Sequence, residues 1–106
     1  MYLAWTTVGD RADADRLAGA AVAAGLAACV QIEGPVTSVY RWAGRIETAA
    51  EYRLTFKVIP ARLAALEAQV LAAHPYTTPE WIVARAELVA EKYLSWAQAN
   101  SSPLPL

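Results

Sequence analysis

Residues 28–59 are the most informative part of the chain for its fold and read ACVQIEGPVTSVYRWAGRIETAAEYRLTFKVI. Apolar and polar side chains alternate through residues 51–59, which is the pattern of a β-strand with one buried face. Ala43-Gly44 separates this strand from residues 28–42, which are also rich in β-branched and aromatic side chains. The two segments therefore predict an unusually long β-hairpin. Gly34-Pro35 interrupts its first strand, and we expect a bulge or a bend there.

The rest of the chain alternates between strand and helix patterns. Residues 2–7 suit a strand that is apolar on both faces. Helical periodicity follows between Asp10, a good N-cap, and Gly25, which suits the position just past a helix end. The remaining elements are a helix from Pro60 to His74, a strand over residues 81–88 and a helix over residues 91–100. This order predicts an α+β, ferredoxin-like βαββαβ antiparallel sheet with an additional C-terminal helix.

The length and charge of the chain exclude several classes of protein. Its 106 residues fit a single domain, which we place at residues 1–100, followed by a flexible tail over residues 101–106. A net charge of −1 disfavours a nucleic-acid partner. The longest uncharged apolar run, Leu17–Val30, is shorter than a bilayer requires and contains glycines. We therefore expect a cytoplasmic protein without a nucleic-acid or membrane partner.

The apolar content is too high for one small core. Apolar residues make up 57% of the chain, whereas a soluble domain typically has about 45–50%. Two helices can cover only one face of a four-stranded sheet, and we expect Trp5, Trp81 and Val83 on the other face. Another copy of the same chain would be the simplest cover for that face.

The residues that could carry chemistry are few. With His74 as the single histidine and Cys29 as the single cysteine, no nucleophile, base and orienting group can be assembled, and we expect no enzyme. His74 either binds the last carbonyls of a helix or acts as a ligand or proton carrier. Cys29 either packs in the sheet or binds a soft metal. One chain cannot close a tetrahedral metal site from these residues, but a site shared between chains can.

A second group of residues could bind a small ligand. Lys57 needs an anionic partner if the polar face of its strand is covered, and the loop from His74 to Glu80 presents an imidazole, a phenol, two hydroxyls and a carboxylate. Trp42 precedes the hairpin turn and could stack on a ligand or anchor an interface, of which we favour the interface.

Three local motifs together are specific for one family. They are LAACV at residues 26–30, SVYRWAG at residues 38–44 and HPYTTPE at residues 74–80, and YLSW at residues 93–96 supports them. The chain resembles the CutA family of divalent-cation-tolerance proteins over about residues 2–97. The resemblance implies a tight homotrimer in which Tyr40 and Trp42 of the hairpin meet a neighbouring subunit. It also implies a likeness to the PII signalling proteins, a link to copper and heavy-metal tolerance, and no catalytic activity.

The chain departs from the family's copper-binding pattern. Members that bind copper carry a cysteine in the first strand and a His-His pair before Pro-Tyr, and the matching positions here hold Trp5 and Ala73-His74. If copper or another divalent cation is bound, we expect Cys29 and His74 as its ligands.

Two alternatives to metal binding remain. The first is a PII-like sensor that binds a small anionic ligand between subunits through Lys57, Tyr76, Glu80, Trp42 and Trp96. The second is a trimeric scaffold for a partner protein.

Overall fold

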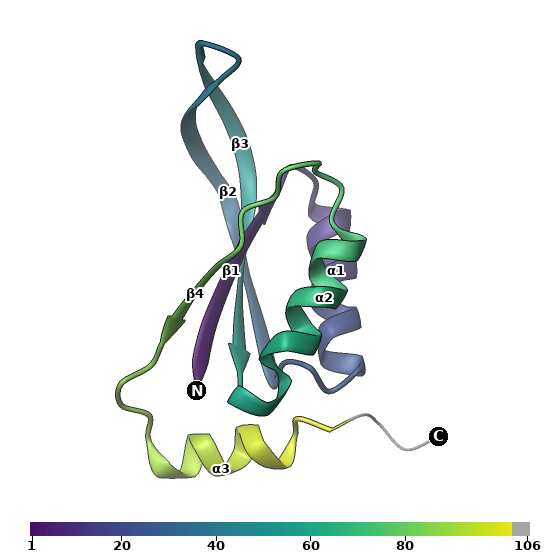
Figure 1. Cartoon of the computed structure of the whole chain (residues 1–106), viewed down its shortest axis with the longest axis vertical. Coiled ribbons are helices and arrows are strands. Elements are labelled where there is room, and N and C mark those ends of the chain that lie inside the picture. The colour runs from purple at the N-terminus through teal and green to yellow at the C-terminus, as the bar shows by residue number, and fades with distance from the viewer. Residues whose placement is uncertain (103–106) are drawn as a thin grey trace.

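The computed structural model describes residues 1–102, and residues 103–106 of the predicted tail lie outside the described part. The helices and strands follow the predicted order (Figure 1). They are β1 (Tyr2–Val8), α1 (Arg11–Ala23), β2 (Cys29–Trp42), β3 (Arg45–Val58), the 3₁₀ turn η1 (Pro60–Arg62), α2 (Leu63–Ala73), β4 (Ile82–Arg85) and α3 (Glu91–Ala99). The four strands form one antiparallel sheet in the order β2-β3-β1-β4. The predicted α+β, ferredoxin-like fold is confirmed.

The hairpin of β2 and β3 is the longest feature of the molecule. Each strand has 14 residues, and the outer half of the pair projects beyond the body of the molecule (Figure 1). Ala43 and Gly44 form the turn, with φ values of 50° and 76°. These left-handed conformations suit the two-residue loop of a twisted hairpin.

The predicted bulge is present at Gly34-Pro35. The pairing steps from Glu33↔Arg53 to Val36↔Glu51, so β2 contains one more residue than β3 over this interval. Gly34 has a φ of +153°, and a Cβ atom on it would lie 2.7 Å from Cδ1 of the Tyr52 ring. The side chains of β2 consequently change faces at this point, because one extra residue reverses the alternation.

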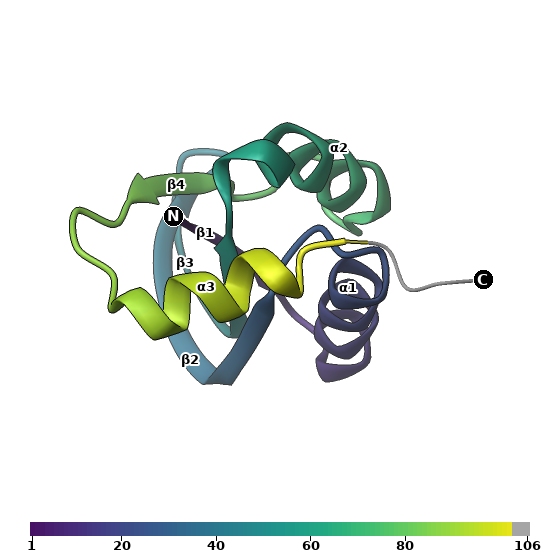
Figure 2. The same cartoon turned by 90° about the horizontal axis from the view of Figure 1, so that it is seen from below.

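One face of the sheet is covered by α1 and α2 (Figure 2). Asp10 caps α1 by accepting a 2.8 Å hydrogen bond from the Ala12 amide, and Gly25 follows its end with a φ of 69°. Leu66 and Val70 of α2 pack with the buried strand residues Ala4, Val8, Leu54, Phe56 and Val58. None of the helices within residues 1–102 is long and apolar enough to cross a membrane.

The opposite face of the sheet carries Leu3, Trp5 and Ile82. Ile82 lies directly opposite Trp5 and is 54% exposed. Trp5 was predicted correctly for this face, but the prediction was wrong for Trp81 and Val83. Both pack against the core on the helical side, where the Trp81 ring lies 5.9 Å from that of Phe56. We call the face that carries Leu3, Trp5 and Ile82 the open face.

Two boundaries differ from the expectation. The fourth strand is β4 (Ile82–Arg85) rather than residues 81–88, because its pairing with β1 ends at Tyr2↔Arg85, where β1 begins. Ser101 belongs to the folded body rather than to a flexible tail. It is buried, and its carbonyl accepts a 3.0 Å hydrogen bond from Arg62 Nε.

Candidate functional site

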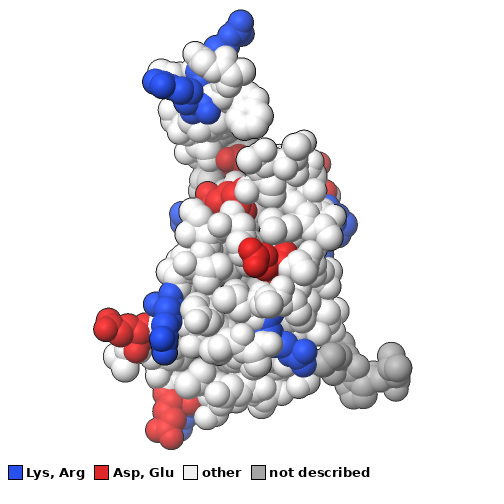
Figure 3. Space-filling model, in the orientation of Figure 1, with Lys and Arg blue, Asp and Glu red and all other residues white. Residues whose placement is uncertain are grey.

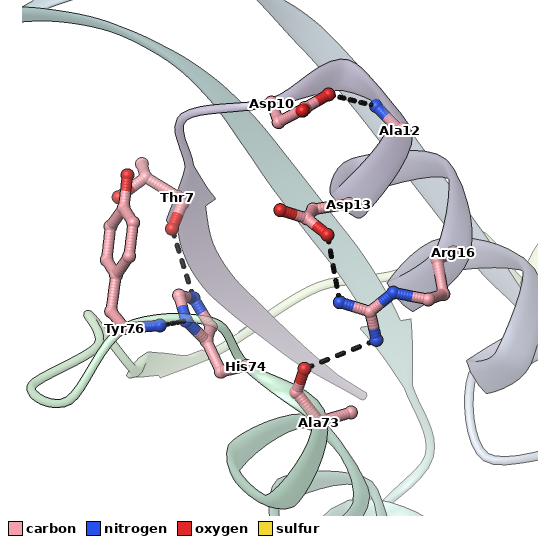
Figure 4. A network of polar contacts seen from close by, with 8 residues as sticks. All are labelled: Thr7, Asp10, Ala12, Asp13, Arg16, Ala73, His74 and Tyr76. Carbon is pink, nitrogen blue, oxygen red and sulfur yellow. Dashed lines mark hydrogen bonds and ion pairs between the residues drawn. The ribbon is translucent and has the colours of Figure 1, made fainter.

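His74 lies at the centre of a polar network that joins α2 to β1 (Figure 4). Its Nε2 lies 3.1 Å from the Thr7 carbonyl oxygen and 3.0 Å from Thr6 Oγ1. Its Nδ1 accepts a 3.1 Å hydrogen bond from the Tyr76 amide. Thr6 Oγ1 donates in turn to the Glu80 carbonyl at 2.7 Å. The network thus ties both ends of the segment from His74 to Glu80 to β1.

These contacts fix the protonation state of His74. Because Nδ1 accepts a hydrogen bond from the Tyr76 amide and Nε2 faces the Thr7 carbonyl, the imidazole is neutral with its proton on Nε2. Burial lowers the pKa of His74 below its usual 6.5, and this effect exceeds the opposing effects of the Thr7 carbonyl and of Asp13. Neither ring nitrogen therefore keeps a free lone pair for a metal ion in this conformation.

Tyr76 connects the same segment to the base of the hairpin. Its Oη donates a 2.8 Å hydrogen bond to Glu51 Oε2. Burial, the hydrogen bond to Glu51 and the negative charge of that carboxylate raise the pKa of Tyr76 from 10.0 to about 12, since all three disfavour the phenolate. A Cβ atom on Gly9 would lie 3.3 Å from this hydroxyl, so the absence of a side chain at Gly9 leaves room for it.

A cavity of about 770 Å³ lies between the hairpin and the segment from Tyr76 to Glu80. The remaining residues that line it are Thr7 of β1 and Ser38, Val39, Tyr40, Trp42, Ala49 and Glu51 of the hairpin. The lining contains two carboxylates and no lysine or arginine. Acidic side chains lie where the hairpin meets the body, and basic ones lie at the tip of the hairpin (Figure 3).

The structure brings together only part of the predicted ligand site. Tyr40, Trp42, Tyr76 and Glu80 line the cavity as one group. Lys57 and Trp96 do not line it. The ammonium of Lys57 lies 5.8 Å above the ring of Tyr93 in α3 instead, so it does not provide the positive charge that an anionic ligand in this cavity would need.

Sequence reasoning missed Glu51 as the central carboxylate of this site. Glu51 is 9% exposed and binds Tyr76. Its position on the polar side of β3 gave no sign of burial, because the segment that covers it comes from residues 76–80, far along the chain.

The two predicted metal ligands are not close to each other within one chain. Cys29 lies on the open face, because it pairs with Lys57, which pairs with Leu3. His74 contacts Thr6 instead. The Thr6 side chain lies on the covered face with Ala4 and Val8. Within residues 1–102, no three His, Cys, Asp or Glu side chains form a group that could hold a metal ion. The residues of a single chain therefore do not fit a metal site.

The fold and the cavity define a small ferredoxin-like α+β protein with an extended hairpin and an acidic pocket at its base. The family model described as CutA1 divalent ion tolerance protein matches residues 2–100. The chain therefore belongs to the CutA family of divalent-cation tolerance proteins.

Individual relatives agree with this assignment. Protein CutA 1, chloroplastic, of Oryza sativa is 38% identical over 97 residues, and the match covers 92% of this chain but 55% of the rice protein. The divalent-cation tolerance protein CutA of Yersinia pestis is 37% identical, and the match covers 89% of this chain and 79% of that protein. CutA of Synechococcus elongatus superposes with a TM-score of 0.91 at 40% identity over 95% of this chain and 89% of that chain. CutA of Xylella fastidiosa superposes with a TM-score of 0.92 at 33% identity over 95% of this chain and 97% of that chain.

Proposed function

We propose that this protein contributes to the tolerance of divalent metal ions as a homotrimer that binds the ion between its subunits. The observation that carries the proposal is the open face, where apolar side chains lie outside the cover of α1 and α2. Ile82 is 54% exposed there, and contiguous exposed apolar surface is typical of a protein interface. The family membership supports a role in metal tolerance in general.

The hairpin supports assembly in a second way. Val39, Trp42 and Ile46 are 67%, 58% and 75% exposed on its outer half, which projects from the body (Figure 1). A long pair of strands with exposed apolar side chains needs further contacts to be stable in water. A neighbouring subunit that receives the hairpin would bury these residues.

The metal ion in this proposal binds at a site shared between chains, because one chain does not supply the ligands. Cys29 is half-buried and lies on the open face, so a neighbouring subunit that covers this face approaches the thiol. A thiolate prefers soft ions such as copper or zinc. His74 can contribute only if the hydrogen bonds of its two ring nitrogens are exchanged for the metal.

The experiment combines mass in solution with metal titration. Light scattering on the purified protein should give three times the chain mass of 11.4 kDa. Calorimetric titration with Cu²⁺ and Zn²⁺ should show binding that Cys29→Ser abolishes and His74→Gln weakens less. A single-chain mass would contradict the trimer, and unchanged binding in both variants would exclude these two residues as ligands.

A further inference from the structure

The base of the hairpin contains a nearly buried carboxylate without a basic partner. Glu51 is 9% exposed, and the contact that its side chain makes is the hydrogen bond from Tyr76 Oη to Oε2. The ion pairs within residues 1–102 involve other carboxylates, those of Asp13, Asp15 and Glu33. Removing a carboxylate from water without a positive charge beside it is costly.

The second carboxylate oxygen of Glu51, Oε1, accepts no hydrogen bond from the described residues. No side-chain oxygen or nitrogen within the described residues is both fully buried and without a hydrogen-bond partner, and Glu51 lines the cavity. Because Oε2 binds Tyr76, Oε1 is the oxygen that remains available to an occupant. The cavity is therefore lined by a negatively charged hydrogen-bond acceptor, the Glu51 carboxylate, of which only Oε2 is hydrogen-bonded to the described part of the protein.

The walls of the cavity are aromatic as well as acidic. Tyr40, Trp42 and Tyr76 line it together with Glu51 and Glu80. Aromatic faces attract a positive charge through their quadrupole, and carboxylates form short hydrogen bonds with ammonium and guanidinium groups. We infer that this cavity is a binding site for a small organic cation that carries an ammonium or guanidinium group on a short apolar body.

The cavity suits an organic cation better than a metal ion or an anion. A volume of about 770 Å³ lies in the range of small-molecule pockets, about 300–1,000 Å³, and exceeds what a bare ion fills. Among the described residues, no three His, Cys, Asp or Glu side chains form a group that could hold a metal ion, and Glu51 and Glu80 are the acidic residues that line this cavity. An anion would face both carboxylates without a lysine or arginine in the lining. The inference is independent of the proposed metal site. It requires that the cavity stays accessible in the proposed trimer, because Thr7 and Glu51 lie on the open face and Trp42 lies on the hairpin that a neighbouring subunit would contact.

The test uses three matched probes on the full-length protein in its native assembly. Butylamine is a cation, butanol a neutral analogue and butyrate an anionic one, so they share an apolar body and differ in charge. Saturation-transfer NMR and calorimetry should show that butylamine binds and that butanol and butyrate do not. Glu51→Gln keeps the size of the side chain and an acceptor for Tyr76, and should weaken butylamine binding about tenfold or more, as expected for loss of a charged hydrogen bond.

Two further variants make the result decisive. Glu33→Gln removes a carboxylate that pairs with Arg53 outside the cavity lining and should leave butylamine binding unchanged. The double variant Arg41→Ala, Arg45→Ala removes basic side chains at the hairpin tip, which a second copy could insert into the cavity. Equal binding of butanol or butyrate, no effect of Glu51→Gln, or binding seen only in the double arginine variant would each overturn the inference.

Discussion

Tyr76 Oη donates a 2.8 Å hydrogen bond to Glu51 Oε2, and this contact joins residues that are 25 positions apart. Tyr76 belongs to the segment after α2, and Glu51 lies in β3 at the base of the hairpin. The bond therefore connects the two walls of the acidic cavity. The properties of this pair provide a direct test of the site in solution.

The phenol of Tyr76 should titrate with a pKa of about 12. Glu51→Gln should lower this pKa towards the usual 10.0, because it removes the negative charge beside the phenol while burial remains. Since the folded-state pKa is raised, the group stabilises the fold below pH 10 and this contribution is lost as the pH rises through 12. Tyrosinate absorbance, compared between the wild-type protein and Tyr76→Phe, isolates this residue. An unchanged pKa in Glu51→Gln would contradict the contact.

The stability of the protein should fall as the pH drops below the usual histidine pKa of 6.5. His74 has a lowered pKa in the fold, so the unfolded chain binds the proton more readily, and the stabilisation is present above 6.5 and lost as the pH falls through the folded-state value. His74→Gln should remove this dependence of the free energy of unfolding on pH. It should also lower the free energy of unfolding by about 1 kcal/mol at pH 8, because the Tyr76 amide loses its acceptor. Denaturant unfolding across pH measures both. A slope that persists in His74→Gln would assign the pH effect to other groups.

The open face should control subunit assembly. Ile82→Asp introduces a charge opposite Trp5 and should shift the mass in solution from three chains towards one. Leu88→Asp provides the matched control, because Leu88 is 92% exposed and lies outside the four strands. Light scattering measures the mass in solution of both variants. An equal shift in the two variants would show that the effect is not specific to the open face.

Gly34 should be intolerant of any side chain. Gly34→Ala places a Cβ atom 2.7 Å from the Tyr52 ring and 3.0 Å from the Glu51 carbonyl, and should lower the free energy of unfolding by about 1–3 kcal/mol. Gly19→Ala is the control, since a Cβ atom there meets nothing within 4 Å and should stabilise α1 by about 0.5–1 kcal/mol. If Gly34→Ala were as stable as the wild-type protein, the bulge would not constrain the hairpin.

The local pattern of the chain was sufficient to predict most of the fold. Alternation over residues 51–59, the cap at Asp10 and the stop at Gly25 depend on neighbours in sequence, and the elements appeared in the order that these patterns indicated. Element ends were less predictable, as β4 shows. Its length depends on where β1 begins, which is a property of the sheet rather than of residues 81–88.

The candidate site was predictable only as separate residues. Tyr40, Trp42, Tyr76 and Glu80 each drew attention in the sequence, but nothing local indicated that they line one cavity with Glu51. His74 illustrates the same limit. Whether its ring nitrogens are free depends on the Thr7 carbonyl, 67 positions away.

Local patterns in the chain were enough to specify which segments are strands and helices, because hydrophobic periodicity, caps and turns act over a few residues. Which side chains share a face of the sheet depended on how the strands pair in the folded chain. One extra residue at Gly34-Pro35 reverses the alternation of β2, and so Ser38, Tyr40 and Trp42 point to the same side as Glu51 and line the cavity with it. The physical reason is that the two-residue period of a strand converts a single insertion into a change of face for every side chain beyond it.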